Sequence, residues 1–143
     1  MKLGILVESG DETRVAIVPN SVPKLIKLGF EVLIESGSGN SAHHPDSEYE
    51  AKGAKISTRE EAMGCNLLIC IGAPDFSSLS EGQMVACVAD PFRHPERIRQ
   101  AMDAKVTLMS MDMIPRRLSR AQAMDVNSSQ DNLAGYKAVL MGA

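Results

Sequence analysis

The chain has 143 residues, of which 44% are hydrophobic and 23% charged, as is typical of one globular domain and too short for a large two-domain enzyme. The net charge of -3 and the absence of Trp argue against a nucleic-acid binder, because both phosphate neutralisation and base stacking would be weak. Three Cys without metal-binding or Cys-x-x-Cys spacing favour a reduced, cytoplasmic setting. No run approaches the roughly 18 apolar residues of a membrane helix, so direct membrane insertion is not expected.

Short apolar runs alternate with helical patterns along the chain. Strands are predicted at residues 2–8, 15–18, 30–35, 54–57, 67–71, 84–88 and 106–110. Continuous apolar runs of this kind suit strands that are covered on both faces, hence a parallel sheet beneath helices.

Helices are predicted between most of these strands, after Asn20 or Ser21, over 46–52 and 59–63, from Pro95, and over 129–140. Thr58 and Glu61 have the spacing of a capping box, and Ile98, Ala101 and Met102 share one face of the Pro95 helix. The alternation predicts an α/β fold with a single doubly wound parallel sheet, flavodoxin-like or Rossmann-like.

The stretch 37–42 matches the G-x-G-x-x-(G/A) pattern directly after a predicted strand. A dinucleotide fingerprint needs a helix that begins inside the motif, so that its amides meet the pyrophosphate. Pro45 disfavours helical geometry at His44, and no acidic residue follows the next strand to hold a ribose. We therefore interpret the stretch as a glycine-rich strand-to-helix turn.

The histidines and cysteines predict no metal site. His43 and His44 are adjacent and would point to opposite faces of an extended segment, so they are interpreted as loop residues. Cys70 and Cys87 lie in apolar strands, where a buried thiol is the ordinary outcome.

A polar segment, residues 115–130, follows the last predicted strand. It contains three Arg, two Gln, an Asp and three Ser at the sheet edge where open α/β sheets bind ligands. These groups can orient a polar cofactor ring through directed hydrogen bonds. The alternative is a solvated loop before a helix that Ser128 or Ser129 caps, and the residue types leave both open.

Several motifs carry a resemblance to a known family. They are Glu12-Thr13-Arg14-Val15-Ala16 with Pro19, Glu35-Ser36-Gly37-Ser38-Gly39, and the stretches 119–125, 128–130 and 134–139. With them the chain resembles the N-terminal signature shared by alanine dehydrogenases and the alpha subunit of proton-translocating nicotinamide nucleotide transhydrogenase. The second half looks like transhydrogenase in particular.

Two departures separate the sister families. Where alanine dehydrogenases carry a substrate-binding Lys this chain has Cys70, and where they carry a catalytic His it has Asp90 or Pro91. The resemblance therefore favours transhydrogenase, in which hydride passes directly between two nicotinamide cofactors without a general acid or base. An alanine or other amino-acid dehydrogenase and a non-catalytic dimerisation module are the alternatives.

The resemblance implies that the alpha subunit binds NAD(H), that a partner subunit binds NADP(H), and that a loop of this domain covers the nicotinamide. By motif, Gln122 and Asp125 take the catalytic positions of that loop. Ser128 and either Arg116 or Arg117 take the cofactor-binding positions.

The resemblance also implies a larger assembly. Residues 1–143 would form the N-terminal domain, with the last helix, 129–143, crossing toward a NAD-binding domain that carries the true GxGxxG turn and that this chain lacks. The chain alone is expected to be inactive and to bind NAD(H) weakly or not at all. Its expected partners are the NAD-binding domain or second portion of the alpha subunit, the beta subunit, and a second copy in a homodimer, at the inner-membrane surface through the complex.

Overall fold

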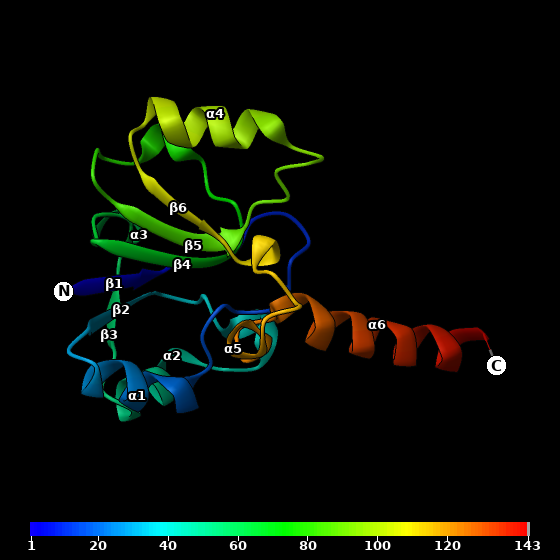
Figure 1. Cartoon of the computed structure of the whole chain (residues 1–143). Coiled ribbons are helices and arrows are strands. Elements are labelled where there is room, and N and C mark those ends of the chain that lie inside the picture. The colour runs from blue at the N-terminus through cyan, green and yellow to red at the C-terminus, as the bar shows by residue number, and fades with distance from the viewer. Residues whose placement is uncertain (143) are drawn as a thin grey trace.

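The computed structural model describes residues 1–142, and its centre is a six-stranded parallel sheet (Figure 1). The strands are β1 (Lys2–Ile5), β2 (Glu31–Glu35), β3 (Lys55–Ser57), β4 (Leu67–Gly72), β5 (Met84–Val88) and β6 (Thr107–Ser110). They lie in the order β3-β2-β1-β4-β5-β6. This order is the Rossmann order, so the predicted doubly wound α/β class is confirmed and is of the Rossmann-like kind.

Helices cover both faces of the sheet. One face packs against α1 (Val22–Lys27) and α2 (Asp46–Ala51), and the other against α3 (Arg59–Met63) and α4 (Pro95–Asp103). After β6 the chain forms the short α5 (Ser119–Gln122) and then α6 (Val126–Gly142), which extends away from the sheet in Figure 1.

Two hydrophobic cores result from the alternation of side chains along the strands. The core beneath α1 and α2 contains Leu3 and Ile5 of β1, both fully buried, together with Tyr49 of α2. The core beneath α3 and α4 contains Leu68 of β4 and Val85 of β5, also fully buried. Because successive strand residues point to opposite faces, short apolar runs feed both cores at once.

Local sequence signals account for several element boundaries. The predicted capping box is confirmed, since the Thr58 hydroxyl accepts from the Glu61 N–H while the Glu61 carboxylate accepts from the Thr58 N–H. The stretch 37–42 forms a turn and a short 3-10 helix, Asn40–Ala42, before α2, as its interpretation as a strand-to-helix turn requires. His43 has a left-handed conformation there, with a φ of 60°.

Four sequence predictions are wrong in detail. The first strand ends at Ile5, three residues earlier than predicted. Residues 15–18 form no strand, because the segment crosses the end of the sheet, where the Ile17 carbonyl accepts a hydrogen bond from Tyr49. Met102 is 71% exposed and does not share the buried face of Ala101. The last helix begins at Val126, three residues earlier than predicted, and Ala143 lies outside the described residues.

Residues 1–142 contain neither a candidate membrane span nor a candidate metal cluster. None of the helices in this range combines the length and the apolar character that a bilayer crossing requires. In the same range, no three His, Cys, Asp or Glu side chains are grouped so that they could hold a metal ion.

The packing of Gly4 gives a test of the fold. A Cβ at Gly4 in β1 would collide with the backbone carbonyl of Ala62 in α3, whereas a Cβ at Gly135 in α6 would meet open space. We expect Gly4→Ala to lower the free energy of unfolding by about 1–3 kcal/mol through overpacking. Gly135→Ala should raise it by up to about 1 kcal/mol through helix propensity. Chemical denaturation of the two variants measures both effects, and equal stabilities would contradict this packing.

Candidate functional site at the carboxyl edge of the sheet

Acidic side chains form hydrogen bonds between neighbouring strands at the carboxyl edge of the sheet. Glu8, just after β1, accepts hydrogen bonds from the backbone N–H groups of Ile71 and Gly72 at the end of β4, at 2.6 and 3.1 Å. Asp112, just after β6, accepts from the backbone N–H groups of Ala89 and Asp90 beyond β5, at 3.2 and 3.1 Å. These carboxylates occupy backbone donors that would otherwise face a ligand at this edge.

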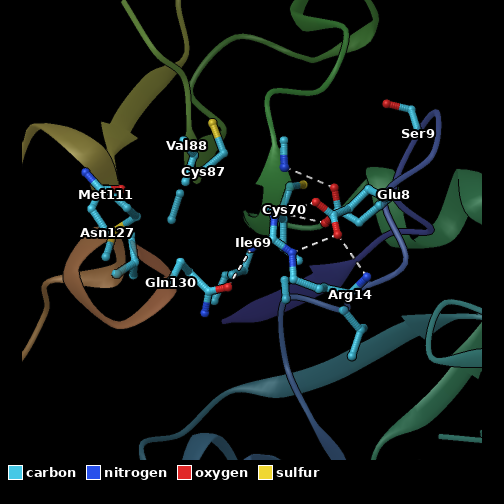
Figure 2. Close-up of a pocket in the computed structure, with 17 residues that line it drawn as sticks. Glu8, Ser9, Arg14, Ile69, Cys70, Cys87, Val88, Met111, Asn127 and Gln130 are labelled. Atoms are coloured by element: carbon cyan, nitrogen blue, oxygen red, sulfur yellow. Dashed lines mark hydrogen bonds and ion pairs between the residues drawn. The ribbon is translucent and has the colours of Figure 1, made fainter. Parts of the chain in front are cut away.

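A cavity of about 660 Å³ lies at this edge, where the strand order reverses between β1 and β4 (Figure 2). Its size is in the usual range for small-molecule sites, and such switch points are where open α/β sheets bind ligands. Its walls are mostly apolar and include Ile69, Ile71, Ala86, Val88, Met111 and Val126.

Arg14 is the cationic residue of the cavity wall. Its Nε and Nη2 donate to the two carboxylate oxygens of Glu12 at 2.8 and 2.5 Å, and its Nη1 donates to Oε1 of Gln130 at 2.7 Å. The hydrogen bonds from Arg14 lower the pKa of Glu12 to about 2, and Glu12 in turn raises the pKa of Arg14. Figure 2 shows Glu8 and Arg14 on one side of the cavity and Asn127 on the other.

The start of α6 separates this cavity from a polar rim, which we define as Arg116, Asp125 and Ser128. Asp125 accepts from the N–H and the hydroxyl of Ser128 at 3.0 and 2.5 Å, and Arg116 Nε lies 3.8 Å from Asp125 Oδ1. The Ser128 hydroxyl and N–H, with Arg116 nearby, lower the pKa of Asp125. Asp125 therefore caps α6, in place of the Ser128 or Ser129 cap of the solvated-loop alternative.

The predicted site residues are only partly brought together. Arg116, Asp125 and Ser128 form the rim, whereas the side chains of Arg117 and Gln122 are exposed and make no hydrogen bond or ion pair within residues 1–142. None of the five lines the cavity.

Sequence reasoning assigned no role to the cavity residue Glu8, and it placed Asn127 and Gln130 in the polar segment 115–130 without singling them out. Glu8 is the last residue of the first predicted strand, and this position at a carboxyl end was the available signal. Glu8 and its partner Ile71 are separated by 63 residues of sequence, so no local sequence pattern reveals their contact.

The two cavity cysteines, Cys70 and Cys87, are buried as predicted. Burial raises the pKa of each thiol to about 12, so both are neutral near pH 7 and are poor nucleophiles. The histidines lie elsewhere: His44 contacts Glu48, and His94 contacts Glu96.

Fold and site together define a Rossmann-like α/β domain with a largely apolar cavity at its switch point and a polar rim beside it. The sequence model of one family, described as "Alanine dehydrogenase/PNT, N-terminal domain", matches residues 4–134. The chain belongs to this family, and the resemblance seen in its motifs is confirmed.

Individual relatives point to the transhydrogenase branch. The chain is 34% identical over 136 residues to NAD(P) transhydrogenase subunit alpha of Haemophilus influenzae, a match that covers 93% of this chain and 26% of that protein. It is also 34% identical over 146 residues to NAD(P) transhydrogenase subunit alpha of Cereibacter sphaeroides, a match that covers 98% of this chain and 28% of that protein.

A solved structure agrees with these sequence relatives. The crystal structure of a transhydrogenase from Sinorhizobium meliloti superposes with a TM-score of 0.92 at 39% identity, over 98% of this chain and 43% of that one. The chain thus spans less than half the length of each of these three proteins.

The Glu12–Arg14 pair predicts a pH dependence of stability. Because the pKa of Glu12 is lowered from 4.5 to about 2, the pair stabilises the fold above pH 4.5 and loses this contribution as the pH falls toward 2. We expect the difference in thermal midpoint between the wild type and Glu12→Gln to shrink from pH 5 to pH 2. Glu81→Gln, which removes the more exposed pair with Lys105, is the matched control and should show a smaller change. A difference for Glu12→Gln that does not vary with pH would contradict the pairing.

Proposed function

We propose that this chain is the N-terminal part of the NAD(H)-binding alpha subunit of a proton-translocating transhydrogenase. In this role it covers the nicotinamide while hydride passes between NAD(H) and the NADP(H) of a beta subunit. The observation that carries the proposal is the polar rim of Arg116, Asp125 and Ser128 beside the cavity, in a chain whose family includes transhydrogenases.

The chemistry of the site suits a reaction that needs positioning rather than proton transfer. Direct hydride transfer requires the reacting carbons within about 3–3.5 Å of each other and no acid or base from the protein. In the described cavity wall, Glu12 is paired with Arg14, and Glu8 accepts two backbone N–H groups. Gln122, with its free amide, is proposed to hydrogen-bond the nicotinamide carboxamide.

The ion pairs of the rim distinguish Arg116 from Arg117 as the cofactor-binding arginine of the loop. Arg116 lies 3.8 Å from Asp125 and 3.6 Å from Asp131, whereas Arg117 points to solvent without an ion pair in the described chain. Ion pairs of this length on a half-exposed side chain are weak, so Arg116 can turn from Asp125 toward a bound cofactor at little cost. We assign Arg116 as the arginine that changes partner, and Arg117 as the second candidate.

The cavity wall favours transhydrogenase over an amino-acid dehydrogenase. Within the part of the chain that the structure describes, no Lys and no His lines the cavity, and Cys70 is a neutral thiol there. A 2-oxo acid in this cavity would lack the His acid/base and the Lys that the dehydrogenase resemblance implies.

Pyrophosphate binding is assigned to a separate NAD-binding domain. Strand-end N–H groups that could cradle phosphate are occupied by Glu8 and Asp112, and the Gly37 N–H donates to Asp46. Much of α6 also presents apolar side chains to solvent. Five of them are each at least 60% exposed: Leu133, Tyr136, Val139, Leu140 and Met141. This apolar surface supports the assignment of the last helix as a crossover against that domain, with homodimer formation as a further part of the proposal.

Substitution of Gln122 tests the proposed role of the rim. In the assembled transhydrogenase, alpha and beta subunits together, we expect Gln122→Asn to slow hydride transfer about 10- to 100-fold, because a shorter side chain misplaces the ring, while NADH affinity changes little. Gln100→Asn, at an exposed position of α4, is the matched control and should leave both unchanged. Stopped-flow transhydrogenation and NADH titration separate the two quantities, and equal losses in rate and affinity would contradict the role.

The occupied strand-end donors lead to a second expectation. The 143-residue chain by itself should show no micromolar affinity for NADH in calorimetry, because within residues 1–142 the backbone donors beyond β4 and β5 are already occupied by Glu8 and Asp112. Micromolar binding by this polypeptide would refute the proposed division of the nucleotide site between two domains.

A further inference from the structure

One hydrogen bond joins the loop after β1 to α6 across 116 residues of sequence. Arg14 Nη1 donates to Gln130 Oε1 at 2.7 Å, and both residues line the cavity rather than the rim. We propose that Arg14 and Gln130 are positioning residues: their bond holds the start of α6 and thereby places Asp125 and Ser128 for the cofactor. The role in the reaction rests on the proposed function, whereas the positioning itself does not.

Arg14 is well fixed at its own end of this bond. The Glu12 carboxylate accepts from the Arg14 backbone N–H at 2.9 Å as well as from Nε and Nη2, so backbone and guanidinium are held by one group. The loop is anchored further by buried Val15 and by the Tyr49 hydroxyl, which donates to Ile17 O at 2.9 Å. A planar guanidinium held along one edge loses little further freedom when its remaining edge donates to Gln130.

The start of α6 forms few other side-chain hydrogen bonds with the loops at the strand ends. Within residues 1–142, the other side-chain hydrogen bond from this helix to the strand-end loops is Asn127 Nδ2 to Asp112 O, which is long at 3.4 Å. Residues 128–142 of α6 are exposed. The Arg14–Gln130 bond is therefore the shortest polar link that determines how α6 leaves the domain.

Helix geometry connects the bond to the rim. Val126, Asn127 and Gln130 face the cavity, while Asp125 and Ser128 form the cap that faces Arg116. At 3.6 residues per turn, Gln130 lies about half a turn beyond Ser128, on another side of the helix. A tilt that releases Gln130 from Arg14 therefore moves Asp125 and Ser128 as well.

The positioning is tested on the whole 143-residue chain with Gln130→Ala and Arg14→Lys. Amide hydrogen exchange over residues 126–131 should become about three- to fivefold faster, as for loss of a half-exposed polar contact, with no change in β1 and β4. The pKa of Asp125, followed by NMR, should rise toward its ordinary value as the tilt moves Asp125 away from Arg116. Unchanged exchange and an unchanged Asp125 pKa in both variants would overturn the proposal.

Two further variants separate positioning from general loss of stability. Asn132→Ala removes an exposed amide from the same helix and should leave exchange and the Asp125 pKa unchanged. Gln130→Glu offers Arg14 a carboxylate in place of the amide and should restore both to wild-type values. A Gln130→Glu variant that behaves like Gln130→Ala would contradict a role through Arg14.

The consequence for the reaction is measured in the assembled transhydrogenase. We expect Gln130→Ala to lower kcat about tenfold with little change in KM, because the cofactor still binds but the rim is misplaced. A loosened α6 with unchanged kcat would overturn the role in the reaction. No hydride transfer by the wild-type assembly would instead refute the proposed function, and the exchange data would still decide the positioning.

Discussion

The carboxyl edge of this sheet depends on carboxylates that accept backbone N–H groups from neighbouring strands. Where a parallel ladder ends, those donors need new partners. Glu35 supplies one for Val7 at 2.7 Å, Glu8 supplies two at the end of β4, and Asp112 supplies two beyond β5. The loops are thereby fixed around the reversal point, which leaves a cavity with a largely apolar wall and few free donors.

The first turn of α6 lies between this edge and the polar rim. One side of the helix contributes Asn127 and Gln130 to the cavity, and its capped end holds Asp125 against Ser128 and Arg116. The remainder of the helix is exposed and rich in apolar side chains, so the helix is held at the end that touches the cavity. A domain docked on the exposed part would be coupled mechanically to the rim through a single rigid element.

Sequence alone predicted the features whose causes are local. Buried parallel strands are encoded as short apolar runs, and the Thr58–Glu61 box is complete within four residues, so both were found. The run at 15–18 has the same β-branched composition but lies beyond the sheet edge, which no local pattern reveals. The cap of α6 was misplaced because Asp and Ser are equally good caps. The contact of Glu8 with β4 and the bond from Arg14 to Gln130 could not be predicted because these partners are distant in sequence.

The protonation states of the cavity side chains limit the chemistry that they can supply. Burial keeps the Cys70 and Cys87 thiols neutral near pH 7, and the pairing with Arg14 keeps Glu12 ionised, so these three groups exchange no protons there. None of these three groups would serve as an acid or base for a reaction that needs one near pH 7. This is compatible with the proposed reaction, because hydride transfer between two nicotinamides takes its chemistry from the cofactors. The amides and guanidinium groups gathered at α6 are then sufficient, since orientation needs directed hydrogen bonds rather than titrating groups.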